Sequence, residues 1–344
     1  MKSRRWMTAT VLCTALVGLG VSPSAAQIKE MELRFANFVP ATLVQSQSDQ
    51  WFVDELAKRS NGKIKMKIFW AESLGKAREI LTMVSQGAVE SGGTAPGYFP
   101  AQIPFMAAPN SLIMTQEKAE QAHIIAHTLM NEIPAMQEEA RQNGVYPLFW
   151  HALNPYYLVC RAPVRTLADL KGKKLRSWGE DIPRAIQAAG AVPVTVFPAE
   201  LYESLQRGFV DCSPYPLDTA VSLKLHEVAK YVTFMNFGAI SGWPQFYNLK
   251  VWESWPEETK KLFKEVAEDA KKLELKWLAD ADAKARETMK AAGVEFIDFP
   301  DQKKFESVAP DFLEDWVGKM EKLGKGADAA KMAKRWKELR AQYR

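Results

Sequence analysis

The sequence predicts an α/β protein with two sheets, a cleft between them and one long helix that spans both. Short strand-like segments alternate with helical ones along residues 31–237. Asn154 and Pro155 separate two apolar strands at 146–153 and 156–163, and residues 256–292 form an uninterrupted helical stretch. A chain of 344 residues is long enough to bury two cores, so we expect two domains.

The first 26 residues have the pattern of a secretory signal peptide. Lys2, Arg4 and Arg5 precede an apolar run at 7–21, and small residues at 24–26 suit cleavage after Ala26. The alternative, a retained membrane anchor, is disfavoured because the apolar run is shorter than the ~20 residues that cross a bilayer. We therefore predict an exported chain.

The charge and cysteine content of the mature chain exclude some functions. The signal holds three of the 45 Lys and Arg and none of the 41 Asp and Glu, which leaves 42 against 41. This balance gives no reason to expect a nucleic-acid partner. Cys160 and Cys212 remain, each at the end of an apolar strand-like run, and we favour two buried thiols over a disulfide.

The predicted elements of the first domain follow the chain in order. Alternation of apolar and polar residues predicts strands at 31–38 and 63–70, and helical spacing of apolar residues predicts a helix between them, ended by Asn61 and Gly62. We further predict a helix at 76–86, a strand at 88–95, a long helix at 116–143 and a strand at 146–153.

The second domain is predicted to repeat the alternation. Its expected strands are 156–163, 173–178, 192–196, 208–212 and 230–237, and its expected helices are 182–189, 198–206 and 219–228. The helix at 256–292 begins at Pro256, ends before Gly293 and would be roughly 55 Å long, so it should cross both domains. Helices at 302–322 and 327–343 complete the chain. We assign 27–154 and about 238–275 to domain I, and 155–237 and about 276–344 to domain II.

Motifs for catalysis and metal binding are scarce. The sequence lacks a nucleophile elbow, a zinc-protease motif, a phosphate-binding loop and a dinucleotide fingerprint. His123 and His127 could share a helix face, but no third ligand is indicated, so we favour a solvated helix face over a metal site. We predict no enzyme activity, no catalytic residues, no metal and no cofactor. A secreted α/β hydrolase is the alternative, and it lacks a visible activated nucleophile.

Aromatic residues are concentrated where the predicted strands end. In open α/β sheets, ligands bind beyond the carboxyl ends of the strands. Arg176 ends one such strand, and its planar guanidinium can hold a carboxylate with two parallel hydrogen bonds. The alternative for Arg176 is a surface salt bridge to Glu180 or Asp181. The aromatic candidates for the wall are Phe38, Trp70, Tyr98, Trp150, Tyr156, Trp178, Tyr215 and Trp243.

Several blocks of the sequence resemble the solute-binding proteins of tripartite ATP-independent periplasmic (TRAP) transporters. The blocks are TLADLKGKKLR at 166–176, GAVPV at 190–194, PAELYESLQRGFVDCSPYPL at 198–217, EVAKYVT at 227–233 and ESLGKAREILTMVSQGAVESG at 72–92. The resemblance covers nearly the whole mature chain in the same order. It implies a periplasmic binding protein fold, a ligand carboxylate held by Arg176, closure of the cleft around an organic anion, and delivery to a membrane permease.

Two departures from the family pattern bear on the ligand. Tyr215 stands where the family commonly has an asparagine that helps to hold the carboxylate, and a second arginine of sialic-acid-type members falls at about Tyr156. Both changes replace polar groups with aromatic wall, so we predict a monocarboxylate with an apolar or aromatic body. Trp178 and Trp243 would add to the wall, with Phe38, Glu72, Tyr98 and Trp150 as candidates from the other domain.

Other interpretations of the same resemblance remain open. The ligand could instead be a small C4-dicarboxylate or a sugar acid, and the partner could be a sensor instead of a permease. We expect a soluble monomer in the periplasm once the signal is removed.

Overall fold

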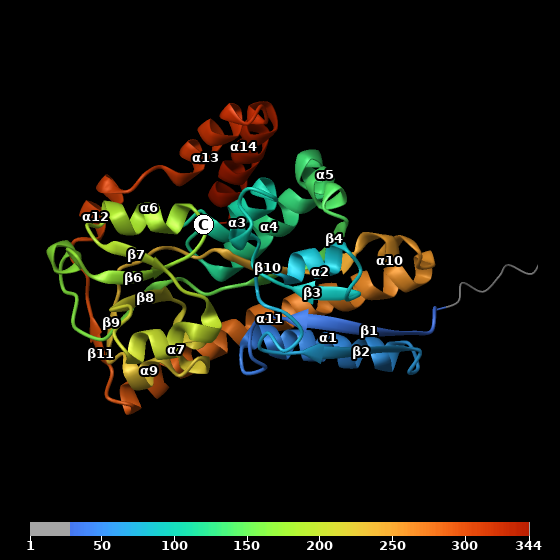
Figure 1. Ribbon diagram of the computed structural model, residues 1–344, viewed down its shortest axis with the longest axis horizontal. Helices are drawn as coiled ribbons and strands as arrows, with labels where there is room; N and C mark the ends of the chain where they lie inside the picture. Colours follow the sequence, from blue (N-terminus) through green and yellow to red (C-terminus); the bar gives the residue numbers. More distant parts are fainter. Residues whose placement is uncertain (1–27, 344) are drawn as a thin grey trace, which may run out of the picture.

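The computed structural model describes residues 28–343, so the predicted signal peptide lies outside the described residues. Within 28–343, no helix combines the length and the hydropathy that crossing a membrane requires. Two sheets lie side by side, with helices around each (Figure 1).

The first sheet has five strands in the order β2-β1-β3-β10-β4. Strand β1 runs parallel to β2 and β3, whereas β10 is antiparallel to both β3 and β4. The strands are β1 (Met31–Asn37), β2 (Ile64–Phe69), β3 (Ser91–Gly93), β4 (Val145–Ala152) and β10 (Ser241–Asn248). The helices of this part are α1 (Val44–Arg59), α2 (Ile80–Ser85), the 3-10 turn η1 (Pro96–Tyr98), α3 (Pro104–Ser111), α4 (Ala119–Glu132), α5 (Pro134–Gln142) and α10 (Leu249–Glu253).

The second sheet has six strands in the order β11-β9-β5-β8-β6-β7. They are β5 (Tyr157–Cys160), β6 (Lys174–Ser177), β7 (Val192–Thr195), β8 (Cys212–Tyr215), β9 (Tyr231–Thr233) and β11 (Glu295–Ile297). Its helices are η2 (Leu167–Leu170), α6 (Asp181–Ala188), α7 (Pro198–Gln206), α8 (Leu217–Ser222) and α9 (Leu225–Val228). The chain therefore contains the two α/β sheets that the sequence predicts, and both combine parallel and antiparallel strands.

The long helix α11 (Glu257–Ala291) has 35 residues and is about 52 Å long. It packs on α1 and β4 of the first part and on α8 of the second, which confirms a helix shared by both (Figure 1). The last helices are α12 (Gln302–Val308), α13 (Phe312–Lys322) and α14 (Gly326–Gln342). Helix α14 packs on α13 and on α4.

The chain passes between the two sheets three times. Residues 153–156 connect β4 to β5, residues 234–240 connect β9 to β10, and α11 makes the third crossing. These three segments are the only covalent routes between the sheets within residues 28–343, so any relative movement of the two halves must bend them.

Prolines shorten several of the predicted helices. The helix expected at 116–143 is two helices, because Pro134 begins α5 after the extended residue Ile133. The helix expected at 302–322 is likewise divided, at Pro310, into α12 and α13. Proline has no N–H to donate and disfavours helical geometry in the residue before it, so both predicted long helices were wrong. The helix expected at 219–228 is also divided, by Lys224 in a left-handed conformation.

Cys160 and Cys212 form a disulfide, which corrects the expectation of two free thiols. They are directly paired residues of the antiparallel strands β5 and β8, with Cα atoms 4.1 Å apart. The predicted strand 208–212 is shifted, because residues 208–211 form the turn that leads into β8 and only Cys212 belongs to the strand. Because β8 begins at Cys212 and continues to Tyr215, Cys212 lies directly opposite Cys160 of β5.

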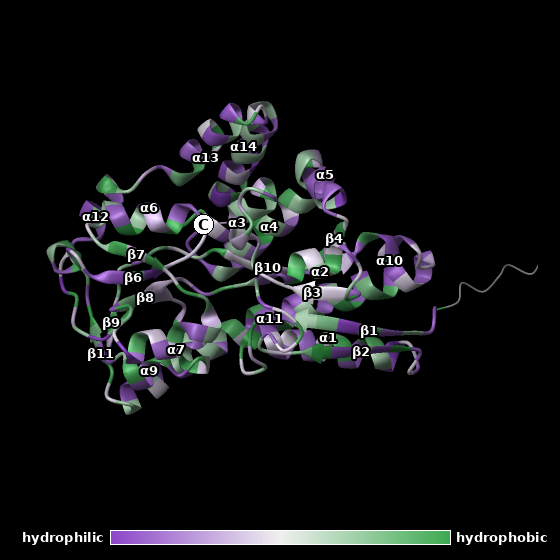
Figure 2. Cartoon of the chain, in the orientation of Figure 1, coloured by the Kyte–Doolittle hydropathy of each residue, from purple (hydrophilic) through white to green (hydrophobic). Residues whose placement is uncertain are grey.

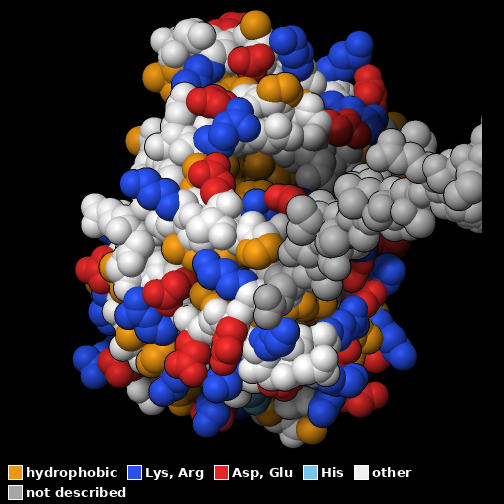
Figure 3. Space-filling view, turned by 90° about the vertical axis from the view of Figure 1, so that its right-hand side faces the viewer, with side chains coloured by type: hydrophobic (Ala, Val, Ile, Leu, Met, Phe, Trp, Pro, Cys, Tyr) orange, Lys and Arg blue, Asp and Glu red, His pale blue; other side chains and the backbone are white. Residues whose placement is uncertain are grey.

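The surface is mixed in character. Hydrophilic and hydrophobic residues alternate along α11, α13 and α14, as expected for helices with one buried side (Figure 2). On the face shown in Figure 3, basic and acidic side chains are interspersed, consistent with the near balance of charges in the sequence.

Candidate ligand-binding cavity

Arg176 lies near the carboxyl end of β6 and is 2% exposed. Its guanidinium carbon is 4.1 Å from the ring centre of Trp178 and 4.7 Å from that of Tyr215, so the cation is within cation–π distance of both rings. Its Nε donates a hydrogen bond of 3.1 Å to the carbonyl oxygen of Val196. Backbone and rings together fix the direction of the guanidinium.

The charge of Arg176 is not neutralised within the described part of the chain. No described carboxylate lies within 4.0 Å of it, and its Nη1 is buried without a hydrogen-bond partner. The predicted alternative, a salt bridge to Glu180 or Asp181, is wrong, because Glu180 pairs with Lys319 and Asp181 with Arg184. A buried cation without an anion is costly, and an anionic ligand removes that cost.

A cavity opens in front of this guanidinium and is lined from both halves of the molecule. Phe38 follows β1, Tyr98 ends η1 and Trp243 lies in β10, and these three belong to the first half. The second half contributes residues at the ends of its strands. The predicted site residues that line the cavity are Phe38, Tyr98, Tyr156, Arg176, Trp178, Tyr215 and Trp243.

The aromatic side chains of the cavity pack on one another. Phe38 meets Tyr98 and Trp243 edge to face, with ring centres 5.9 Å and 4.9 Å apart. Tyr156 lies 5.7 Å from Trp178 and 6.1 Å from Tyr215. Such packing holds the rings in place and leaves an aromatic lining around one fixed cation.

Three predicted site residues, Trp70, Glu72 and Trp150, do not line this cavity. The carboxylate of Glu72 is used locally, since it binds Lys76 Nζ at 3.0 Å and accepts from the Ala77 N–H at 3.0 Å. Trp150 is buried in β4, where its backbone N–H donates to His127 Nε2 at 3.1 Å. In this conformation none of the three side chains belongs to the lining around Arg176.

The cavity also has lining residues that the sequence did not indicate. Asn110 of α3 accepts a hydrogen bond from the Gly97 N–H at 2.9 Å and donates to the carbonyl oxygens of Ser241 and Gly242 at 2.8 and 2.7 Å. It thereby ties η1, which carries Tyr98, to β10, which carries Trp243. The others are Val39, Leu43, Ala95, Leu153, Pro198 and Thr219.

Three tyrosines bring hydroxyl groups to the cavity. Burial raises the pKa of Tyr98, of Tyr156 and of Tyr215, while the nearby Arg176 charge acts in the opposite direction and is outweighed. All three therefore stay protonated at neutral pH and can donate a hydrogen bond to an oxygen of a ligand.

The two halves are closed on each other. Phe197, which precedes α7, meets Tyr98 across the cleft with ring centres 4.9 Å apart, and the Arg78 guanidinium lies 4.4 Å from the Phe197 ring centre. Ser111 and Asp181 are joined across it at 3.2 Å. The cavity measures about 40 Å³, room for a few water molecules, whereas pockets for small molecules usually measure ~300–1,000 Å³. Ligand entry therefore requires the halves to separate.

His123 and His127 do not form a solvated helix face, contrary to the prediction. Their ring centres are 4.4 Å apart and His123 is buried. Burial lowers the pKa of His123 to about 3 and holds the pKa of His127 well below its ordinary value, so both rings are neutral. Within residues 28–343, no three His, Cys, Asp or Glu side chains are grouped to hold a metal ion.

Two sheets with a closed cleft between them, crossed by one long helix and containing a buried arginine, define a class: bilobal proteins that bind a solute between their halves. The sequence profile of the bacterial extracellular solute-binding proteins, family 7 (DctP), matches residues 35–315. The chain belongs to this family, the non-enzymatic periplasmic solute-binding proteins of TRAP transporters.

Individual relatives support the same membership. The chain is 26% identical over 329 residues to the 2,3-diketo-L-gulonate-binding periplasmic protein YiaO of Escherichia coli, covering 95% of this chain and 97% of the relative. A TRAP solute-binding protein from Pseudomonas putida, solved with D-glucuronate, is 26% identical, with a TM-score of 0.75 and 89% and 97% of the two chains covered. One from Desulfovibrio salexigens, solved with orotic acid, is 23% identical, with a TM-score of 0.80 and 90% and 99% covered.

Proposed function

We propose that this protein captures a small organic acid, as its carboxylate anion, by closing the cleft around it. The observation that carries the proposal is the buried guanidinium of Arg176, which has no carboxylate partner among residues 28–343 and faces an aromatic cavity between the two halves. A ligand carboxylate supplies the missing negative charge and accepts hydrogen bonds from the guanidinium N–H groups that are not bonded to Val196.

The preferred ligand is a monocarboxylate with an apolar or aromatic body. Six aromatic rings line the cavity, and Arg176 is the only charged residue in its lining. A second carboxylate would be desolvated there without a cation, which disfavours C4-dicarboxylates. The tyrosine hydroxyls would serve one or two ligand oxygens. The orotic acid of the Desulfovibrio salexigens protein supports the view that this fold accommodates a flat carboxylate.

Sugar acids are the competing ligand class, because the Pseudomonas putida relative was solved with D-glucuronate and the Escherichia coli relative binds 2,3-diketo-L-gulonate. Each hydroxyl of such a ligand needs a hydrogen-bond partner on burial. Asn110, the one amide in the lining, already uses its side chain within the protein. The lining therefore favours an apolar body over a polyhydroxylated one.

The family supplies the wider setting of the proposal. A signal peptide would direct export and be removed after Ala26, and a loaded, monomeric protein would deliver its ligand to the membrane subunits of a TRAP permease.

The test is a calorimetric and thermal-shift comparison of phenylacetate, benzoate and orotate with D-glucuronate, D-galacturonate and succinate, using the mature chain. A ligand that binds only the folded state raises the melting temperature. Binding of the aromatic acids alone supports the proposal. Binding of sugar acids or succinate alone keeps the carboxylate anchor and overturns the aromatic preference, and binding of none overturns the organic-acid assignment.

A further inference from the structure

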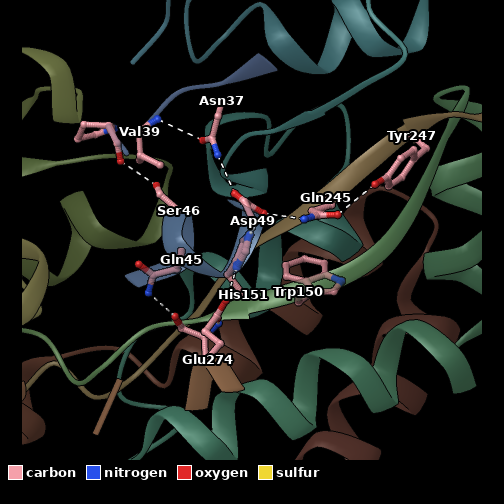
Figure 4. Close-up of polar contacts among 12 residues, drawn as sticks. Asn37, Val39, Gln45, Ser46, Asp49, Trp150, His151, Gln245, Tyr247 and Glu274 are labelled. Atoms are coloured by element: carbon pink, nitrogen blue, oxygen red, sulfur yellow. Dashed lines mark hydrogen bonds and ion pairs between the residues drawn. The ribbon is translucent and has the colours of Figure 1, made fainter. Parts of the chain in front are cut away.

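A buried group of three charged residues lies behind the cavity. His151 Nδ1 is 2.6 Å from Glu274 Oε2, and His151 Nε2 is 3.1 Å from Asp49 Oδ1 in a second ion pair (Figure 4). The three side chains are at most 2% exposed. They come from α1, β4 and α11, so one imidazolium joins two helices to an edge strand of the first sheet.

The carboxylates of this triad are also bound by neutral groups. Asp49 accepts from Asn37 Nδ2 at 2.8 Å and from Gln245 Nε2 at 2.6 Å. Glu274 Oε1 accepts from the Ala152 N–H at 2.7 Å, and the Ala152 carbonyl accepts from Gln45 Nε2 at 2.7 Å. The last residue of β4 is thus held on both sides by helices.

The segment held in this way is the first crossing between the halves. Beyond Ala152, Asn154 Nδ2 donates to the Leu278 carbonyl oxygen and to Asp218 Oδ1, both at 3.0 Å. Glu274 and Leu278 are one turn apart on α11, so the long helix binds the end of β4 at Ala152 and the following connection at Asn154. Asp218 lies in α8, so its hydrogen bond with Asn154 joins the second half to the same connection.

The triad also touches the cavity wall. The His151 ring centre is 5.0 Å from that of Trp243, which lines the cavity, and Gly242 is so close to His151 that a Cβ there would lie 2.9 Å from the His151 Cβ and carbonyl oxygen. His151, which lies in β4 just before the first crossing, is therefore also in contact with Trp243 of the cavity wall.

We propose that the Asp49–His151–Glu274 triad fixes the pivot of cleft closure, with His151 as a positioning residue for the Trp243 wall. Hydrogen bonds are directional, and Glu274 of α11 forms them with both His151 Nδ1 and the Ala152 N–H of β4, so the triad sets one register between β4 and α11, which packing of apolar side chains alone specifies less strictly. Opening then bends the chain beyond Ala152 and leaves the first half unchanged. This role rests on the proposed function only in that closure serves ligand capture.

The test measures the separation of the halves in the mature chain without ligand. Spin labels on Ser73→Cys and Glu203→Cys, exposed positions in the first and second half, report the distance by electron–electron double resonance. The native cysteines are buried in their disulfide and escape labelling. His151→Gln should broaden the distance distribution relative to the otherwise unaltered labelled protein.

Asn248→Ala is the matched control. Asn248 is a buried residue of the same sheet whose side chain donates to the carbonyl oxygens of Val84 and Ser85 at 2.8 and 3.1 Å. It pairs with Val145, at the opposite end of β4 from Ala152, so its loss destabilises the first half away from the crossing. A broadened distribution in His151→Gln but not in Asn248→Ala supports the proposal. An unchanged distribution in a folded His151→Gln protein overturns it, whatever its stability.

Two further measurements decide the case if His151→Gln does not fold. Glu274→Gln keeps an acceptor for the Ala152 N–H but removes the charge, and it should broaden the distribution in the same way. If neither variant folds, amide exchange of the wild-type protein decides: protection of Ala152 equal to that of global unfolding supports a fixed pivot, and exchange through local opening overturns it.

Failure of the proposed function would give a different result from failure of this inference, because the distance measurement uses no ligand. If phenylacetate binds, its dissociation rate constant should also rise about tenfold in His151→Gln and stay unchanged in Asn248→Ala, since effects on closure act mainly on dissociation. An unchanged rate constant in a folded His151→Gln protein would contradict the pivot while leaving the ligand class intact.

Discussion

The side chain of Arg176 and the backbone of Val196 are joined by a 3.1 Å hydrogen bond that uses only Nε of the guanidinium. The bond anchors one edge of the planar group, and the rings of Trp178 and Tyr215 pack against it. Nη1 has no partner in the described part of the chain. The Arg176 guanidinium is therefore oriented before a ligand binds, which lowers the entropic cost of binding.

Replacing Arg176 by lysine should weaken ligand binding at least tenfold while leaving the ligand-free protein folded. Lysine keeps the charge but cannot form two parallel hydrogen bonds or stack a planar group on an aromatic ring. One charge-assisted hydrogen bond contributes about 1.5–3 kcal/mol. Calorimetry with the tightest acid of the panel measures the loss, and equal affinity in Arg176→Lys would contradict the assignment of a bidentate anchor.

Gly93→Ala should weaken binding through the Trp243 wall. A Cβ at Gly93 would lie 3.0 Å from Trp243 Cδ1 and Nε1 and 3.3 Å from Phe35 Cζ, so the indole must shift. Overpacking of this kind typically costs about 1–3 kcal/mol of stability. Gly318→Ala in α13 is the control, because nothing lies within 4 Å of its Cβ position and alanine favours a helix. Unaltered affinity in Gly93→Ala would show that Trp243 is not part of the binding wall.

Loss of the disulfide should destabilise the protein without removing the site. Cys160 and Cys212 are 52 residues apart, and closing a loop of that length stabilises the folded state by roughly 4 kcal/mol through the unfolded chain. Denaturant unfolding of Cys160→Ala/Cys212→Ala, compared with the oxidised protein, measures the difference. A free energy of unfolding equal to that of the wild type would mean that the bond adds nothing to stability.

His151 should make stability depend on pH in the alkaline range. Burial alone would lower its pKa, but the carboxylates of Glu274 and Asp49 outweigh burial and raise the pKa of His151 to about 10. The folded state thus holds a proton that the unfolded chain releases near pH 6.5. Its stabilising contribution is complete below pH 6.5 and disappears as pH rises to about 10.

The measurement for this prediction is the free energy of unfolding between pH 6 and 10, in wild type and His151→Gln. The difference between the two proteins should shrink as pH rises. Parallel curves would show that His151 holds no extra proton in the folded state.

Sequence patterns predicted the cavity largely because of topology. Phe38, Tyr98, Trp178 and Tyr215 follow or end strands, and the carboxyl ends of parallel strands meet at one edge of a sheet. Strand order thus brings Trp178 and Tyr215 to one edge of the second sheet, whereas their meeting with Phe38 and Tyr98 around Arg176 also requires the two halves to face each other. Their action on a ligand stays a prediction.

Other parts of the molecule gave no readable pattern. All eight residues of β10 are buried, so the strand that carries Trp243 shows no alternation. Asn110 lies in α3, whose residues are all buried and include Pro109. The sequence therefore shows neither the helical spacing of apolar residues nor a reason to select Asn110. Glu274 is one of many acidic residues on α11, and only its contact with His151 from β4 distinguishes it.

The disulfide closes a covalent ring that contains both Arg176 and Val196. The cation, its backbone partner and α6 and α7 thus belong to one tethered subdomain whose folding is favoured by oxidation. In a reducing cytoplasm the ring is open and this subdomain is less stable. The free energy of unfolding of this subdomain is therefore linked to the redox state of the compartment, so the same chain is more stable wherever oxidants keep the ring closed.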